Sequence, residues 1–141
     1  MFEKAYEMRV KEWRDFRAFL EYATNPVQLA IDKYKGAPAV DIQTDPWDKE
    51  TWPEPWELIL ENQYCDFCKL LGIFYSLQLT DRFSDIAFEI HIAIDKEKEK
   101  TYYLLFAEDL VIGYDDALCV HKTKLPSSLE SQMVYDMKHL N

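Results

Sequence analysis

Hydrophobic and polar positions follow two different periods along the chain, and the change of period separates a helical part from a strand-rich part. Over residues 2–22, large apolar side chains recur every three or four positions, which is the spacing of one face of an α-helix. A second helix is predicted from Pro26, with Asn25 as its N-cap, and it ends at Gly36. We expect these two helices to form a hairpin over residues 1–36.

Two further helices are predicted after a connector rich in proline and acidic residues. The connector covers residues 37–54, where the prolines preclude a regular element through most of its length. Pro55 fits the first turn of a short helix that ends at Asn62, and a core helix follows from about Tyr64. The inward side of this core helix carries five apolar residues at helical spacing: Phe67, Leu70, Leu71, Phe74 and Leu77.

The period then changes to two. Isoleucine and phenylalanine occupy alternate positions over residues 86–94, as expected for a β-strand with one buried face. The charged run 96–100 is typical of a hairpin tip, and residues 101–107 return as a strand that is apolar on both sides and therefore central. Residues 110–114 and 117–123 can add further short strands.

A capping box, Ser127-x-x-Glu130, predicts a helix at the end of the sequence. The apolar residues of this helix would be Leu129, Met133, Met137 and Leu140. The predicted fold class is therefore α+β: an N-terminal helical hairpin, two core helices packed on a small antiparallel sheet, and a C-terminal helix. Residues 55–141 would form the body of one compact unit, with the hairpin available for interaction or oligomerisation.

Composition and charge narrow the class of partner. The chain has 141 residues, of which 48% are hydrophobic and 15% aromatic, and this composition predicts a globular domain with a real core. The net charge is −10, so the surface repels phosphates. Sequence-independent binding to nucleic acid is therefore not expected. The apolar runs are too short for a membrane span, and no membrane partner is expected. The opening MFEKAYEMRVKEW is charged from its third residue, unlike a signal peptide, so an intracellular chain with reduced thiols is expected.

Three cysteines raise the question of thiol chemistry, because Cys65 and Cys68 form a CxxC pair. A redox pair of this kind normally follows a strand, whereas a helix precedes this one. A zinc site is a weak alternative, built from three thiols and an imidazole: Cys65, Cys68, Cys119 and His121. The apolar neighbours of Cys68 and Cys119 favour packing, since free cysteine behaves as a small hydrophobe. No metal or other cofactor is expected.

A third interpretation makes Cys65 a nucleophile. A thiol at a helix N-terminus gains from the helix dipole, which favours the thiolate. The imidazole and the carboxylate that such a nucleophile needs follow in order, as His91 on the next strand and Asp109 after the strand beyond it. This interpretation predicts acyl-transfer or amide-cleaving chemistry in a cleft lined by Trp52 and Trp56.

The same order of elements resembles a known fold. A tryptophan-bearing helix, a core helix starting near a cysteine, a strand with histidine and a strand ending in aspartate resemble the transglutaminase-like cysteine fold over about residues 55–112. Members of that fold include transglutaminases and papain-like peptidases. The stretch WPEPWELILENQYCDFCKLLGIFYSLQL is also similar to short proteins of tailed bacteriophages that carry a PWEL helix, a YxxF helix and an LGxxYxL segment. In the enzymes the nucleophile stands two positions before an Asp-Phe-Ala-like step, and this sequence has Tyr64 there. The resemblance thus implies the frame of the fold without its chemistry.

The leading hypothesis is a non-catalytic structural or assembly protein of a tailed phage, acting through contacts with other particle proteins or with itself. It implies a location in the host bacterial cytoplasm, in the virion, or in both. The interface is expected on the first helix, which carries residue types that anchor interfaces: Trp13, Phe16, Arg17 and Leu20. The thiol enzyme and the zinc-stapled adaptor are the two alternatives.

Overall fold

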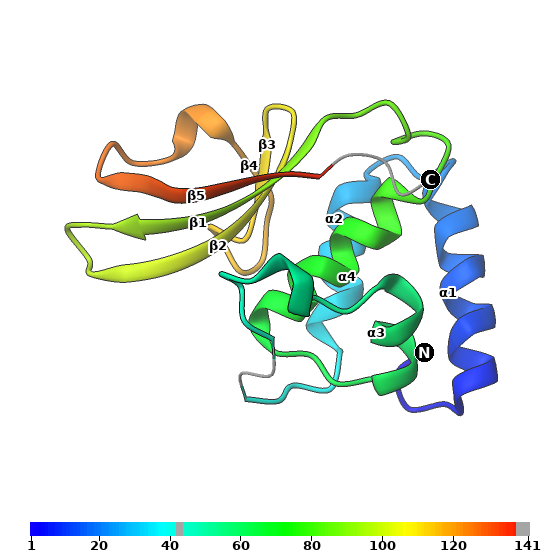
Figure 1. Cartoon of the computed structure of the whole chain (residues 1–141). Helices are drawn as coiled ribbons and strands as arrows, with labels where there is room; N and C mark the ends of the chain where they lie inside the picture. Colours follow the sequence, from blue (N-terminus) through cyan, green and yellow to red (C-terminus); the bar gives the residue numbers. More distant parts are fainter. Residues whose placement is uncertain (42–43, 138–141) are drawn as a thin grey trace. The chain divides into compact units, whose positions relative to one another are not determined.

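The computed structural model describes residues 1–41 and 44–137, and the chain divides into two compact units, Met1–Ser84 and Asp85–Asn141. Within the described residues, the first unit contains four α-helices and the second a five-stranded antiparallel sheet (Figure 1). The fold class is therefore α+β, as predicted. No helix in the described part of the chain is both long and apolar enough to cross a membrane.

The helices of the first unit are α1 (Tyr6–Leu20), α2 (Pro26–Lys35), α3 (Pro55–Glu61) and α4 (Asp66–Gln78). Every residue of α4 except Asp66 and Lys69 is buried, and α4 contacts each of the other three helices (Figure 1). The five residues predicted to face inward are buried, which confirms that interpretation. The first two helices thus pack against α3 and α4 within one unit, and the division of the chain falls after Ser84.

A buried polar cluster joins three of these helices. Ser76 on α4 is fully buried, and its Oγ accepts a hydrogen bond of 2.8 Å from Trp13 Nε1 on α1. The Oγ lies 3.2 Å from the hydroxyl of Tyr34 on α2 and donates to the Gly72 carbonyl at 2.8 Å. The Ser76 hydroxyl thereby satisfies two buried donors, from Trp13 and Tyr34, and one buried acceptor, the Gly72 carbonyl. These hydrogen bonds fix α1 and α2 in specific positions against α4.

The strands of the second unit are β1 (Phe88–Asp95), β2 (Lys100–Ala107), β3 (Leu110–Ile112), β4 (Val120–His121) and β5 (Leu129–Met137). They lie in the order β4-β3-β2-β1-β5, and every neighbouring pair is antiparallel. β2 lies between β1 and β3, so the prediction of a central strand is confirmed. Of the region predicted as a strand over residues 117–123, only β4 and the short 3-10 helix η2 (Lys122–Lys124) are regular.

One face of the sheet carries a hydrophobic cluster built from residues of the second unit. Its buried members are Ala93, Tyr102, Leu104 and Val111. Partly buried side chains from β2, from the segment after β3 and from the start of β5 pack against it: Phe106, Tyr114, Val120, Leu125 and Leu129. The other face of β1 carries Phe88, Ile90 and Ile92, which are buried as the alternating pattern predicted.

The hairpin between β1 and β2 is closed by Asp95. Its Oδ1 accepts the backbone N–H groups of Glu97 at 3.0 Å and Lys98 at 3.2 Å. Burial of this carboxyl pushes its pKa up, but hydrogen bonds from Lys98, the Ser128 hydroxyl and Glu97 outweigh burial and hold the pKa below its usual value. The charged tip is therefore an ordered turn, with Glu99 in the left-handed region at a φ of 51°.

The predicted C-terminal helix is wrong, because residues 129–137 form strand β5. β5 pairs along the whole of β1, from Phe88 opposite Met137 to Asp95 opposite Leu129. A helix in this segment would leave the second edge of β1 without hydrogen-bond partners, and sheet pairing therefore overrides the local capping signal of Ser127 and Glu130. Leu140, also predicted to lie on that helix, is outside the described residues.

Candidate functional site

The two cysteines of the CxxC pair lie at the start of α4 and are both buried. Cys65 is the N-cap residue and Cys68 lies in the first turn, with exposed fractions of 5% and 2%. Cys68 Sγ is 3.3 Å from Thr44 Oγ1. Hydrogen bonding to the Cys65 thiol and burial raise the pKa of the Cys68 thiol well above its usual value. Cys68 is therefore an uncharged, packed thiol, and no disulfide joins Cys65 to Cys68.

His91, the predicted general base, has both ring nitrogens engaged within its own sheet. Nδ1 is 2.7 Å from Ser131 Oγ on β5, and Nε2 is 3.1 Å from Glu89 Oε1 on β1. The ring stacks on Phe106 at a centroid distance of 4.1 Å, and the side chain is 12% exposed. A general base needs one nitrogen available for the nucleophile, and neither nitrogen of His91 is available here.

Asp109, predicted to orient that histidine, has other partners. It lies in the turn between β2 and β3, and its Oδ1 forms an ion pair of 2.9 Å with Lys122. Its Oδ2 is 3.9 Å from His121 Nε2. The hydrogen bond from Lys122 holds the pKa of Asp109 below its usual value. The structure thus brings Asp109 to His121 and Lys122 instead of His91, so the predicted histidine–aspartate link is wrong.

Sequence reasoning missed the chain of contacts Ser131–His91–Glu89. Glu89 and His91 are two apart on one strand and therefore share a face, but Ser131 joins them only through the pairing of β1 with β5. The order of hydroxyl, imidazole and carboxylate is that of a hydrolase relay. Here the ring is stacked and almost covered, and all three groups lie on one face of adjacent strands. We interpret these contacts between Ser131, His91 and Glu89 as a structural link that stabilises the pairing of β1 with β5.

The zinc alternative needs ligands from both units. No group of three or more histidine, cysteine, aspartate or glutamate side chains suited to a metal occurs in residues 1–41 and 44–137. His121 Nδ1 accepts the backbone N–H of Thr123 at 3.2 Å and lies 2.9 Å from its hydroxyl, so this nitrogen caps η2. Of the four predicted ligands, Cys65 and Cys68 lie in the first unit, whereas Cys119 and His121 lie in the second.

The predicted interface on α1 is half core. Trp13 and Leu20 are 1% and 0% exposed, so neither contacts a partner in this fold, and their assignment as interface residues is wrong. Phe16 is half-buried beneath Lys33, whose Nζ is 5.1 Å from the ring centroid. The Arg17 guanidinium lies 4.3 Å over the Trp13 ring, which anchors it inside the unit.

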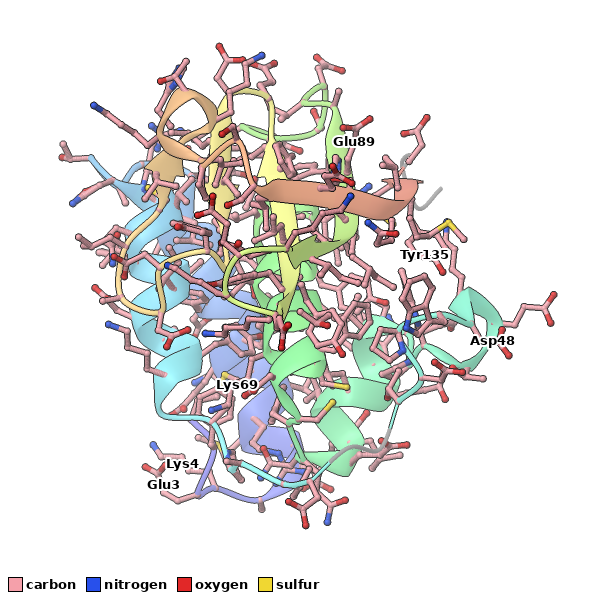
Figure 2. The ribbon with its side chains drawn as sticks, turned by 90° about the vertical axis from the view of Figure 1, so that its left-hand side faces the viewer. Glu3, Lys4, Asp48, Lys69, Glu89 and Tyr135 are labelled. Atoms are coloured by element: carbon pink, nitrogen blue, oxygen red, sulfur yellow. The ribbon has the colours of Figure 1, made fainter. Side chains whose placement is uncertain are left out.

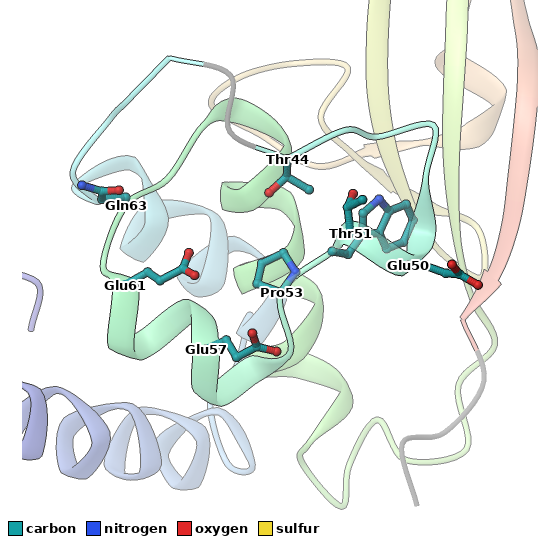
Figure 3. Close-up of a pocket in the computed structure, with 8 residues that line it drawn as sticks. Thr44, Glu50, Thr51, Pro53, Glu57, Glu61 and Gln63 are labelled. Carbon is teal, nitrogen blue, oxygen red and sulfur yellow. The ribbon is translucent and has the colours of Figure 1, made fainter.

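A polar hollow lies between the connector and α3, close to where a cleft was predicted. It has a volume of about 560 Å³ and is lined by the residues drawn in Figure 3: Thr44, Glu50, Thr51, Trp52, Pro53, Glu57, Glu61 and Gln63. Trp52 lines it as predicted and is fixed by a hydrogen bond from Nε1 to the Asp45 carbonyl at 3.0 Å. Trp56 is absent from the lining, since it packs edge-on against Trp13 at 5.3 Å and is 50% exposed. Three glutamates give the hollow an acidic character that favours cations over anions.

Comparisons with known proteins add no family to these observations. No protein-family model matches the sequence, and no curated protein matches it significantly.

Proposed function

We propose that this chain is a non-catalytic structural or assembly protein of a tailed bacteriophage, working through protein–protein contacts. The observation that carries the non-catalytic part is the partner set of His91 and Asp109. Each has its polar atoms engaged by other residues, so a cysteine nucleophile would find no imidazole nitrogen without a partner at His91. The phage part rests on the likeness of the PWEL, YxxF and LGxxYxL segments to short phage proteins.

The surface of the first unit supports a role in protein contacts. The solvent side of α1 and the turn after it expose large apolar side chains, with exposed fractions of 42% for Met8, 60% for Phe19 and 93% for Tyr22. Met8 and Phe19 are eleven residues apart, which is three helical turns, so they lie on one face. Trp56 and Leu60, one turn apart on α3, are exposed by 50% and 58%. Aromatic anchors of this kind are enriched at the centres of interfaces.

The motifs of the resemblance also have a packing explanation that needs no catalysis. In the LGxxYxL segment, Leu71 and Leu77 are fully buried, and the Tyr75 hydroxyl donates to the Pro53 carbonyl at 2.6 Å. Tyr64 of the YxxF segment makes edge contacts with Phe2 and Tyr34 at 5.5 and 5.7 Å. We therefore propose that the residues of these segments serve to stabilise the fold of the first unit.

The test of the non-catalytic part is cysteine labelling by iodoacetamide, mapped by peptide mass spectrometry from about pH 5 to about pH 9, around the free-thiol pKa of about 8.5. Cys119 is half-buried and serves as the internal reference for the two buried cysteines. We expect Cys119 to react first, and Cys65 and Cys68 to react more slowly at every pH. Labelling of Cys65 ahead of Cys119 at low pH, abolished in His91→Ala, would mean an activated thiolate and a thiol enzyme.

The phage part has a separate test. Peptides of the chain should be found at a fixed copy number in purified particles of the phage that encodes it, or in its assembly intermediates. Their absence from both would remove the assembly role and leave only the non-catalytic conclusion.

A further inference from the structure

β5 is a long edge strand whose protection is limited to one bulge and two acidic side chains. It lies at one end of the strand order and pairs with β1 on one side only. It is nine residues long, contains no Lys, Arg or Pro, and is exposed over most of its length. Natural edge strands are commonly short or carry lysine or proline, because their unpaired N–H and C=O groups attract another strand. The one irregularity is a bulge at Gln132, between the pairs Ile92–Met133 and Ala93–Ser131.

The charges beside this edge are unbalanced. Glu89 on β1 stands directly opposite Asp136 on β5, so two carboxylates share one face of adjacent strands. Like charges in this position destabilise a sheet. Figure 2 shows Glu89 on the other side of the β5 ribbon from Tyr135, as the register requires. His91 contacts Glu89, but no cation pairs with Asp136 among residues 1–41 and 44–137.

Apolar side chains flank these carboxylates. Met133 and Val134 are exposed by 38% and 47%, and they point to opposite faces of the sheet. On the far half of the strand, Glu130 already pairs with Lys96 at 2.9 Å. The part of the edge from Met133 to Asp136 therefore offers backbone hydrogen-bonding groups, two apolar contacts and a carboxylate that pairs with no cation of the described residues.

We propose that the outer edge of β5 takes up an extended segment of another polypeptide as a sixth strand, with a Lys or Arg of that segment beside Asp136 and Glu89. Backbone hydrogen bonds give such strand addition its affinity, and alternate side chains give its specificity. The cation relieves the repulsion between the two carboxylates, and apolar residues of the segment cover Met133 and Val134. This inference names the partner chemistry for the contacts in the proposed function and rests on it.

A second copy of this chain is the less suitable occupant. Antiparallel pairing of two β5 strands about Met133 places Glu130 of one copy opposite Asp136 of the other, twice in the pair. Since residues 129–137 hold no basic residue, self-pairing would add like-charge contacts without compensation. A basic segment meets the charge requirement, and an acidic one does not.

The experiment uses the full chain and a fluorescein-labelled peptide of about ten residues in which lysine alternates with valine and threonine, a length that covers β5. Two control peptides separate the causes: one has glutamate in place of lysine, and the other keeps the lysines but has N-methylated amides along one edge, which removes backbone donors. Binding is followed by fluorescence anisotropy, and amide hydrogen exchange locates it on the chain.

The expected result is binding of the lysine peptide with slowed exchange of β5 amides, and weaker binding of both controls. Asp136→Asn should lower the affinity for the lysine peptide about two- to fivefold, the effect expected from the loss of one exposed ion pair. The matched variant Asp116→Asn removes the same charge from an exposed turn of the same unit and should leave affinity unchanged.

Three results would overturn the proposal. Equal binding of the N-methylated peptide would mean charge attraction without strand addition, and equal binding of the glutamate peptide would remove the basic partner. Protection of β5 in the absence of peptide, rising with protein concentration, would identify a second copy as the occupant. None of these results bears on thiol reactivity, so the proposed non-catalytic role would stand or fall separately.

Discussion

Replacing Gly72 by alanine should destabilise the first unit, although the same change stabilises most helices. Alanine in the interior of a helix is favoured over glycine by about 1 kcal/mol. Gly72 lies on the side of α4 that faces α2, and a Cβ there would stand 2.7 Å from Cζ and 2.9 Å from Cδ1 of Tyr34, and closer still to its Cε1. Carbon atoms pack best at about 3.5–4.0 Å, so either the ring or the helix must move.

The surroundings of Tyr34 prevent an easy adjustment. The residue is 1% exposed, and its ring makes edge contacts with Phe2 at 5.6 Å and with Tyr64 at 5.7 Å. Its hydroxyl is bound to Ser76, and burial raises the pKa of Tyr34 to about 12, so the phenol stays protonated and bonded. Displacing the ring would disturb all three contacts together.

The magnitude follows from these opposing effects. Overpacking of a core typically costs about 1–3 kcal/mol, and weakening the hydrogen bond to Ser76 adds about 1 kcal/mol. The higher helix propensity of alanine offsets about 1 kcal/mol of this cost. The free energy of unfolding should therefore fall by about 1–3 kcal/mol, within the usual range for a single destabilising substitution.

The assay is urea unfolding followed by tryptophan fluorescence, because all four tryptophans lie in the first unit and report it selectively. Gly36→Ala is the matched control: its φ is −84°, and the nearest atom to an added Cβ is the Lys33 carbonyl oxygen at 3.7 Å. This variant should be neutral or more stable by up to about 1 kcal/mol. If Gly72→Ala and Gly36→Ala were stabilised to the same extent, the packing argument would be refuted, and the helix propensity of alanine would explain both results. A Tyr34→Leu background should recover part of the loss.

Two further predictions test the core and the sheet. Trp13→Ala should lower the free energy of unfolding of the first unit by about 3–5 kcal/mol in a denaturant titration, because the side chain is buried and donates to Ser76; an interface residue would leave stability unchanged and weaken only binding. The pKa of Asp95 in the folded chain lies below its usual 3.8, so its stabilising effect is fully present above that pH and is lost as pH falls through the folded pKa. Wild type should accordingly be more stable than Asp95→Asn near neutral pH, and the difference should shrink in circular dichroism melts as pH falls through the folded pKa of Asp95. A constant difference down to acid pH would exclude the linkage.

The sequence by itself determined the elements whose pattern is local. The core face of α4 was predicted correctly because five large apolar residues at helical spacing admit only one buried side. The end of α3 at Asn62 was also predictable, since this residue takes the left-handed conformation, with a φ of 52°, that ends many helices. The alternating residues of β1 and the doubly apolar β2 fixed a hairpin and its central strand in the same way.

Tertiary structure decided everything that depends on residues distant in the chain. The capping box at Ser127 is a real local signal, but pairing with β1 makes that segment a strand, and no local pattern reveals the need of β1 for a second partner. Tryptophan is a residue type that often anchors interfaces, but Trp13 is buried and donates a hydrogen bond to Ser76, 63 residues away in the chain. Only the tertiary structure shows this contact. The same pairing gave His91 its contact with Ser131 and set Asp136 opposite Glu89. Periodicity determines which side of an element is buried, because that requires only neighbouring residues, whereas partners across elements depend on the register in which distant segments meet.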